Sequence, residues 1–308
     1  MTGGTGFVGA HLTRLLLDHD ADVTALSSRP RRSHDALGDL SEVPPFAVVE
    51  AALDDEHAVK TAVDAVAPEI VFHLAAYSHA GDAWDDAAAC LRVNVEGTAN
   101  LIAAVAPHAP AAFVHTSSAA VYGVGEPPFH EDDPLRPASP YAISKHAAEL
   151  LCGGAASRFG LHVVQLRLFN TYGPGQTPDR IIPGLIAHGL DREPLAMTSG
   201  EQTREFNFVG DVVHAIALAA LVGRATGQTI NIGGGEETSI ADLARTVLGR
   251  MGDPVEPDIG ALETRPVEMM RLCANAERAS ELLGWEASTS LADGLDQTIA
   301  WYAAQRGS

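Results

Sequence analysis

The chain has 308 residues, of which 46% are hydrophobic and 19% are charged, enough to bury a large core and to divide into two lobes. Its formal net charge of −20 disfavours nucleic acid and anionic membranes as partners, and an anionic ligand must be gathered by local arginines and backbone amides. The sequence contains neither an apolar run of the roughly 18 residues that a membrane span needs nor a recognisable signal peptide. Cys90, Cys152 and Cys273 are odd in number and widely spaced, so we expect no disulfide framework and a reduced, cytoplasmic protein.

A glycine-rich turn opens the chain as Thr2-Gly3-Gly4-Thr5-Gly6-Phe7-Val8-Gly9. Glycines with this spacing let the backbone turn sharply and approach a dinucleotide pyrophosphate, and the helix expected over residues 6–19 directs its positive end at the phosphates. A purely structural turn is the alternative. Such a turn normally follows a buried strand, so the sequence is expected to be short at its N-terminus, with a slot in the sheet.

Short apolar runs then alternate with helical stretches. Several runs are apolar on both faces, as buried parallel strands are, and the alternation predicts a doubly wound α/β sheet. The predicted strands are 22–26, 46–50, 69–74, 111–117 and 162–168, and the predicted helices are 6–19, 55–66, 90–105 and 141–159.

Past Asn170 the pattern changes. A loop is predicted at 173–178, a short strand at 229–232, and a helix from its N-cap Ser239 to residue 250. We therefore expect a dinucleotide-binding domain over 1–168, to which 207–232 returns, and a smaller mixed α/β lobe over 169–308 that binds the substrate.

The strand at 22–26 runs into Ser27-Ser28-Arg29. An acidic side chain at this point would hold the ribose hydroxyls of NAD, whereas serines followed by arginine suit a 2′-phosphate. The loop therefore favours NADP(H), with NAD as the alternative. It can also be interpreted as a solvated basic loop that binds no cofactor.

Tyr141 and Lys145 are four residues apart, so a helix places them on one face. A nearby ammonium favours the phenolate and is expected to lower the pKa of Tyr141, which can then exchange a proton with an alcohol while hydride moves at the neighbouring carbon. Ser118, after the strand at 111–117, could stabilise charge on the same oxygen, and Ser117 is its rival.

These residues resemble those of the extended short-chain dehydrogenase/reductase family, and in particular its nucleotide-sugar epimerases, dehydratases and reductases. The resemblance covers essentially the whole chain and implies a Rossmann-like sheet. Besides the glycine turn, the motifs are His73-Leu74-Ala75-Ala76, Asn94-Val95-Glu96-Gly97-Thr98, Ser117-Ser118-Ala119-Ala120-Val121-Tyr122-Gly123, Tyr141-Ala142-Ile143-Ser144-Lys145, Leu168-Phe169-Asn170-Thr171-Tyr172-Gly173-Pro174-Gly175, Arg204-Glu205-Phe206 and Leu282-Leu283-Gly284-Trp285.

The resemblance also implies roles for individual residues. Ala75 and Ala76 would line the cofactor, and Asn94 would touch its ribose or nicotinamide side. Backbone groups near Leu53 would meet the adenine, because Ala52 stands where the family often has an aspartate. On the substrate side, Asn170, Arg204 and Arg265 would bind the diphosphate, Glu268 the nucleoside ribose, and Ser78 and His79 the sugar. No metal is implied.

One departure bears on the reaction. Family dehydratases carry an Asp-Glu pair where this chain has Ala119 and Ala120, and a methyl group cannot transfer protons. Dehydration is therefore disfavoured. The leading hypothesis is an NADP-dependent 4-keto reductase of a nucleotide-diphosphate sugar, the first alternative is an NAD-dependent 4-epimerase, and the second is a dinucleotide sensor or scaffold without catalysis. A homodimer through the helices at 90–105 and 141–159 is expected from the family.

Overall fold

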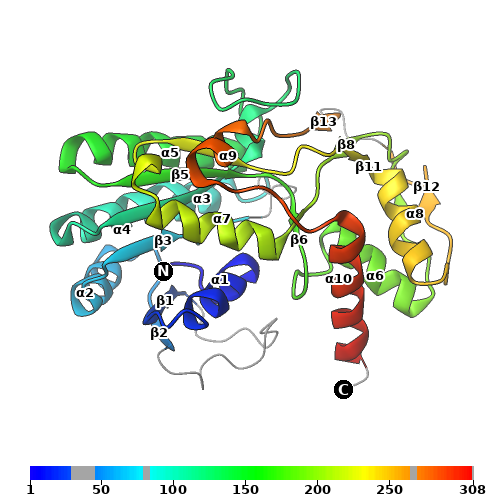
Figure 1. Ribbon diagram of the computed structural model, residues 1–308, viewed down its shortest axis with the longest axis horizontal. Helices are drawn as coiled ribbons and strands as arrows, with labels where there is room; N and C mark the ends of the chain where they lie inside the picture. Colours follow the sequence, from blue (N-terminus) through cyan, green and yellow to red (C-terminus); the bar gives the residue numbers. More distant parts are fainter. Residues whose placement is uncertain (29–45, 79–83, 264–268, 307–308) are drawn as a thin grey trace.

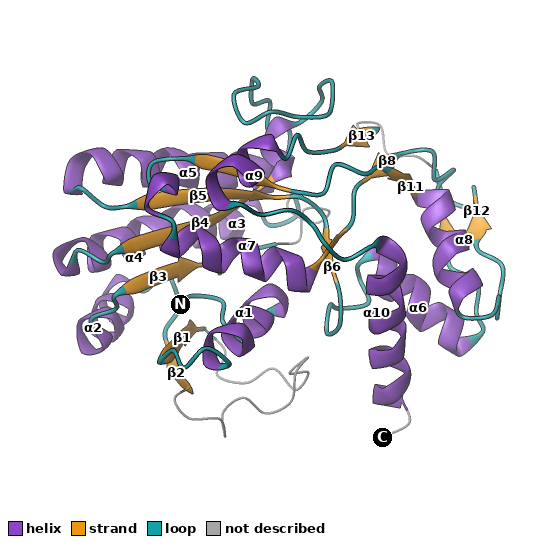
Figure 2. Ribbon diagram, viewed as in Figure 1, coloured by secondary structure: helices purple, strands orange, loops and turns teal. Residues whose placement is uncertain are grey.

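The computed structural model describes residues 1–28, 46–78, 84–263 and 269–306. Its larger part is a parallel sheet between layers of helices (Figures 1 and 2). The strands are β1 (Val23–Ser27), β2 (Phe46–Glu50), β3 (Ile70–His73), β4 (Ala112–Ser118), β5 (Val163–Leu168) and β10 (Thr229–Ile232). The helices beside them are α1 (Phe7–Leu17), α2 (Glu56–Val66), α3 (Ala87–Leu91), α4 (Gly97–Val105), α5 (Pro140–Phe159), α7 (Val209–Leu221) and α9 (Glu277–Leu283).

Each face of the sheet has its own apolar core. Leu12 of α1 and Ile216 of α7 pack with Val114 and Leu166 on one face. The other face carries α2, α4 and α5, whose buried side chains meet β1, β3 and β4. Because both faces are covered, all but the last residue of β4 are buried. The predicted doubly wound fold is confirmed.

The strands of the main sheet form two hydrogen-bonded sets. β1 pairs with β2, and β3, β4, β5 and β10 pair in that order, all in parallel. The two sets are joined by Thr2, which forms bridges to both Leu26 and His73. Its N–H donates to Phe72 O at 2.9 Å, and its carbonyl accepts from Leu74 N at 3.2 Å.

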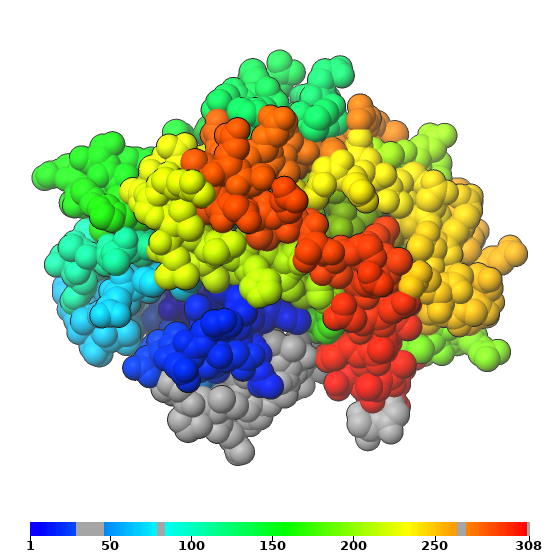
Figure 3. Space-filling view, in the orientation of Figure 1, coloured from blue at the N-terminus to red at the C-terminus, as the bar shows by residue number. Residues whose placement is uncertain are grey.

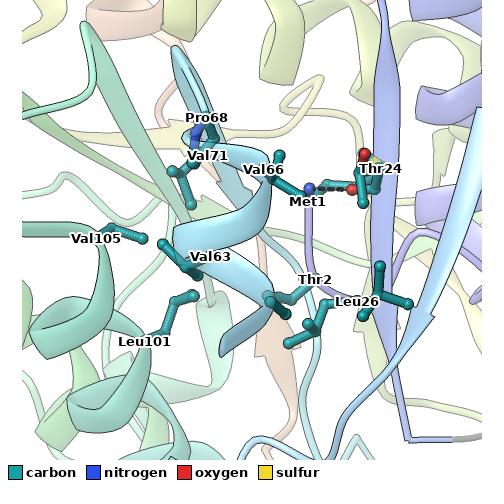
Figure 4. A pocket seen from close by; sticks show the side chains of 12 residues that line it. Met1, Thr2, Thr24, Leu26, Val63, Val66, Pro68, Val71, Leu101 and Val105 are labelled. Carbon is teal, nitrogen blue, oxygen red and sulfur yellow. Dashed lines mark hydrogen bonds between the residues drawn. The ribbon is translucent and has the colours of Figure 1, made fainter. Parts of the chain in front are cut away.

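A cavity of about 50 Å³ lies beside this junction. Figure 4 shows Val63, Leu101 and Val105 on one side of it, while the amino group of Met1 donates to Thr24 O at 2.6 Å on the other. Burial lowers the pKa of that amino group to about 6. The cavity is lined almost wholly by apolar side chains, so it offers water few partners.

The second part of the molecule is built on shorter elements. Its three-stranded sheet has the order β11-β8-β13, and its core unites α6, α8 and α10. Figure 3 shows the orange and red C-terminal segment crossing one face, from α9 beside α7 to α10 beside α8. The elements are β6 (Thr171–Tyr172), α6 (Ile181–Asp191), β7 (Ala196–Met197), β8 (Thr203–Arg204), β9 (Asn207–Phe208), β11 (Thr238–Ser239), α8 (Ile240–Arg250), β12 (Asp258–Ile259), β13 (Arg271–Leu272) and α10 (Leu291–Arg306).

Two later elements, β10 and α7, lie on the main sheet. β10 pairs with β5, and α7 packs against α1. Helix α9 also contacts α7 and β10, so part of the C-terminal third lies on the main sheet. Within the described ranges, no helix combines the length and apolar character needed to cross a membrane.

Candidate active site

The glycine turn has the shape that close approach to a ligand requires. Gly3 has φ +71°, and a Cβ there would lie 2.7 Å from Ala75 N. A Cβ on Gly9 would lie 2.0 Å from Gly3 O, so α1 can begin against the turn only without a side chain. Gly6 is the N-cap of α1 and has no side chain to cap it, so the first N–H groups of the helix can bind an anion. The turn therefore fits a dinucleotide pyrophosphate.

The predicted cofactor contacts near the turn are placed in part. Ser27 ends β1, and its Oγ lies 3.2 Å from Thr5 Oγ1. Ala75 N donates to Thr2 Oγ1 at 3.1 Å, which brings the Ala75-Ala76 segment beside the turn. Leu53 is buried in the core, and its carbonyl accepts from Asn100 Nδ2 at 2.9 Å. Arg29 lies outside the described residues.

Tyr141 and Ser118 meet at the carboxyl end of the sheet. Ser139 caps α5 by accepting from Ala142 N at 3.2 Å, Pro140 is its first residue and Tyr141 its second. Ser118 ends β4, and its side chain lies close enough to the Tyr141 phenol to lower the pKa of that phenol. Ser117, its rival, points to the opposite face of the sheet, because successive strand residues alternate in direction. Its Oγ is buried without a protein partner. Ser118 is therefore the serine placed to act with Tyr141.

Lys145 lies one turn along α5 and is almost fully buried. Its Nζ donates to Thr116 O at 2.5 Å, and burial lowers its pKa to about 8. The pKa of Tyr141 is raised by burial, and the groups that oppose this rise are Ser118 and Arg180. The expected lowering of the Tyr141 pKa by Lys145 is thus wrong for this arrangement, because the ammonium is bound to the β4 backbone.

Asn94 occupies a π-helical turn, η2 (Arg92–Glu96), between α3 and α4. Its amide nitrogen donates to Ser144 Oγ at 2.8 Å, and its oxygen accepts from Tyr77 N at 2.7 Å. Ser144 Oγ in turn donates to Tyr141 O at 2.8 Å. This side chain, which the family resemblance predicts to touch the cofactor, is 3% exposed and links the segment after β3 to α5. π-Helical turns are frequent at functional sites.

His73 is buried below this site in one tautomer. Thr98 Oγ1 donates to Asn94 O at 2.6 Å, so its oxygen accepts from His73 Nε2 at 2.9 Å. His73 Nδ1 then accepts from Thr2 Oγ1 at 2.8 Å. Burial, with help from the Lys145 charge, lowers the pKa of His73 to about 3, and the ring is neutral at physiological pH.

A buried ion pair supports the strand that ends beside Asn170. Arg167 of β5 donates from Nε and Nη2 to the two carboxylate oxygens of Glu149 on α5, at 2.9 and 3.0 Å. Its Nη1 donates to Tyr122 Oη at 3.0 Å, and Tyr122 donates to Asn231 Oδ1 at 2.6 Å. This network ties α5 and β10 to the turn that follows Ser118.

The substrate side contains a cation that the sequence analysis missed. Arg180 precedes α6, donates from Nη2 to Ser78 O at 3.0 Å, and lies close enough to Tyr141 to lower its pKa. The loop at 173–178 was recognised only as a loop, and the arginine after it was the available signal. Asn170 follows β5 and Arg204 ends β8. His79, Arg265 and Glu268 lie outside the described residues.

The described residues bring together no group of three or more His, Cys, Asp or Glu side chains that could hold a metal ion. The site instead offers a glycine turn for a dinucleotide and a tyrosine–serine pair for proton transfer. The fold and this site define a dinucleotide-dependent oxidoreductase of the short-chain dehydrogenase/reductase type. Residues 1–233 match the NAD dependent epimerase/dehydratase family, and the chain belongs to that family.

Similar proteins have several activities. The chain is 36% identical to a dTDP-glucose 4,6-dehydratase of Streptomyces griseus, over 99% of this chain and 94% of that protein. It is 32% identical to a UDP-glucose 4-epimerase of Mycolicibacterium smegmatis, over 98% and 97% of the two chains. The structure of MoeE5 in complex with UDP-glucuronic acid and NAD superimposes with a TM-score of 0.88 at 32% identity, covering 99% and 98% of the chains.

Proposed function

We propose that this protein is a nucleotide-sugar 4-epimerase, which oxidises the sugar C4 hydroxyl and returns hydride to the opposite face of the ketone. The observation that carries the proposal is the closeness of Ser118 to the Tyr141 phenol, at the sheet edge that also bears the glycine turn. Support comes from the similar UDP-glucose 4-epimerase and from MoeE5, whose structure contains a UDP-sugar and NAD.

In this proposal the glycine turn and the first turn of α1 hold the pyrophosphate of NAD, which when bound supplies the hydride acceptor. Tyr141 takes the proton from the C4 hydroxyl and returns it after the ketone has turned over. Ser118 donates to the same oxygen and stabilises the charge that develops there. Lys145 keeps a positive charge below this position while its pKa, about 8, is above the pH.

Dehydration needs an acid and a base that this site does not place at the expected positions. Ala119 is 1% exposed and Ala120 only partly exposed, and both carry methyl groups where dehydratases of the family carry Asp and Glu. The proposal therefore excludes 4,6-dehydration, although the similar Streptomyces griseus protein is a dehydratase.

A 4-keto reductase that uses NADPH is the second candidate, and Ser27 favours it. This serine ends β1 and contacts Thr5 of the glycine turn, at the position where an acid would select NAD. The two functions differ in their use of the cofactor. Protein that carries stoichiometric NAD after purification and interconverts UDP-glucose with its C4 epimer supports the epimerase, whereas consumption of NADPH with a 4-keto sugar supports the reductase.

Replacing Tyr141 by Phe tests the acid–base role. Because the change removes one hydroxyl, we expect the rate of either reaction to fall by about 10²- to 10⁴-fold while NAD affinity stays within about twofold. Tyr77→Phe is a matched control for loss of a phenol. A Tyr141→Phe enzyme as fast as the parent contradicts the role, and a parent that binds NAD but converts no nucleotide sugar favours a sensor or scaffold.

We further propose a homodimer through α3 and α5, in a reducing compartment that keeps the three buried cysteines free. Three large apolar side chains of these helices are exposed: Leu91 at 43%, Ile143 at 43% and Leu150 at 65%. A Cβ added at Gly153 or Gly154 of α5 would meet nothing within 4 Å, so this part of the helix is open to close approach by another surface.

A further inference from the structure

Glu205 is a buried acid to which the proposed reaction gives no role. It follows β8 directly and is 1% exposed. Its two carboxylate oxygens accept from Gly235 N at 2.7 Å and from Ala274 N at 3.2 Å. A Cβ on Gly233 would lie 2.2 Å from Oε1, so the turn after β10 has space for the carboxylate only with glycine there.

Asn207, two residues further on, completes the contact. Its Oδ1 accepts from Gly234 N at 2.7 Å, so Glu205 and Asn207 together hold two consecutive N–H groups of the turn after β10. The N–H of Asn207 donates to Asn170 O at 2.8 Å. The segment from Glu205 to Asn207 is therefore fixed to the ends of β10 and β5.

This attachment determines where Arg204 lies. Arg204 belongs to β8, which pairs with β11 and β13 in the substrate lobe. The carboxylate of its neighbour Glu205 connects that lobe to the main sheet, whose carboxyl edge carries Ser118. A shift of the carboxylate would move Arg204 relative to the catalytic residues, because the two residues share one backbone.

We propose that ionised Glu205 is a positioning residue that holds Arg204 on the diphosphate of the substrate by binding the Gly235 and Ala274 amides. The inference rests on the proposed function, since a diphosphate ligand at Arg204 is part of it. It adds a dependence of substrate binding on the protonation of a side chain that the substrate does not touch.

Burial raises the pKa of Glu205 to about 7, against the two backbone N–H groups that favour its charge. The other ionisable side chains around Glu205 do not change their charge near pH 7. The hydrogen bond from Arg271 holds the pKa of Glu237 below its usual range, and burial raises the pKa of Cys273 to about 12. Arg271 and Arg204 remain cationic. Of these five groups, Glu205 is the one that titrates near pH 7.

Protonation weakens the contact because a carboxylic acid has less capacity to accept than a carboxylate. With a midpoint near 7, the ionised fraction falls from about nine tenths at pH 8 to about one tenth at pH 6. If substrate binding needs the ionised form, its affinity falls about tenfold over the same interval.

The test is calorimetric titration with UDP-glucose and dTDP-glucose at pH 6, 7 and 8, in a Tyr141→Phe background that stops turnover. These probes lack the terminal phosphate whose own pKa of about 6 would obscure the result. We expect binding of one sugar nucleotide to weaken about tenfold from pH 8 to pH 6. Glu205→Gln should bind about tenfold more weakly than the parent at pH 8 and lose this pH dependence. With Tyr141 restored, it should raise KM and leave kcat within about twofold.

Asp211→Asn is the matched control. Asp211 is another buried carboxylate that accepts from two backbone amides, Ser288 N at 3.2 Å and Thr289 N at 2.8 Å, and its side chain has no bond to β8. We expect its variant to retain the parental affinity and pH profile. Glu205→Gln with parental affinity and profile overturns the positioning role while the proposed function stands. Should Glu205→Gln not fold, an affinity in the parent that is equal at pH 6 and 8 overturns it. A parent that binds neither sugar nucleotide removes the proposed function and the inference together.

Discussion

Replacing Glu149 by Gln tests the buried ion pair that supports the site. The side chains of Arg167 and Glu149 are 6% and 5% exposed, and their bidentate contact leaves a guanidinium without a counter-charge when Glu149 is neutralised. Breaking a buried pair from one side costs about 3 to 5 kcal/mol. Since Arg167 keeps its bonds to Tyr122 and to Glu131 O, we take the lower value.

The shift in melting temperature follows from chain length. An unfolding entropy of about 2.1 cal/mol/K per residue gives about 0.65 kcal/mol/K for 308 residues, so about 3 kcal/mol lowers Tm by about 5 °C. Differential scanning calorimetry at pH 7 measures this shift. The double variant Glu149→Gln/Arg167→Met should recover most of the loss, because the buried guanidinium that lost its carboxylate partner is removed as well. A single variant within about 1 °C of the parent, or a double variant no more stable than the single, refutes the reasoning.

Three further outcomes are expected. His73 has a folded pKa of about 3, below its ordinary value, so the unfolded state takes up its proton first and stability is lost as pH falls below about 6.5. Between pH 7 and pH 5 the free energy of unfolding, measured by urea denaturation, should fall by about 2 kcal/mol because of His73. The fall in a His73→Asn variant should be smaller than that of the parent by this amount, and equal falls in the two proteins contradict the buried neutral ring. Val63→Ile places one methylene in the cavity beside Thr2 and should raise the unfolding free energy by about 0.8 kcal/mol, whereas Val59→Ile, in the core away from the cavity, should lower it. Leu150→Glu, at 65% exposure on α5, should shift the protein from dimer to monomer by size-exclusion chromatography with light scattering, and a parent that is already monomeric contradicts the proposed interface.

The sheet could be predicted because the apolar residues of its strands match their buried position between the helices. Strands rich in apolar residues, such as Ile70–His73, are stable between two helical layers. The start of α5 was equally clear, since Ser139 and Pro140 are typical of a helix N-terminus. The two-residue strands β8 and β13 carry no periodicity, and they exist because backbone from distant parts of the chain pairs with them.

Individual residues of the site were less predictable than its motifs. The spacing of Tyr141 and Lys145 gave the correct helix face but not the partner of the ammonium, which is the carbonyl of Thr116 on another element. Asn94 was identified from its motif. Its contacts, however, depend on a π-helical turn that no residue pattern in 90–105 predicts. Arg180 was missed because its effect on Tyr141 arises only when a loop returns over the sheet.

Thr2 lies between two groups of strands in the main sheet. On one side lie β1 and β2, on the other β3, β4, β5 and β10, and a single residue forms bridges to both. Thr2 is also the first residue of the glycine turn, so a pyrophosphate held by that turn would lie near both groups of strands. A bound dinucleotide would then link the two groups of strands through the glycine turn, and loss of the coenzyme is expected to weaken the contact between them.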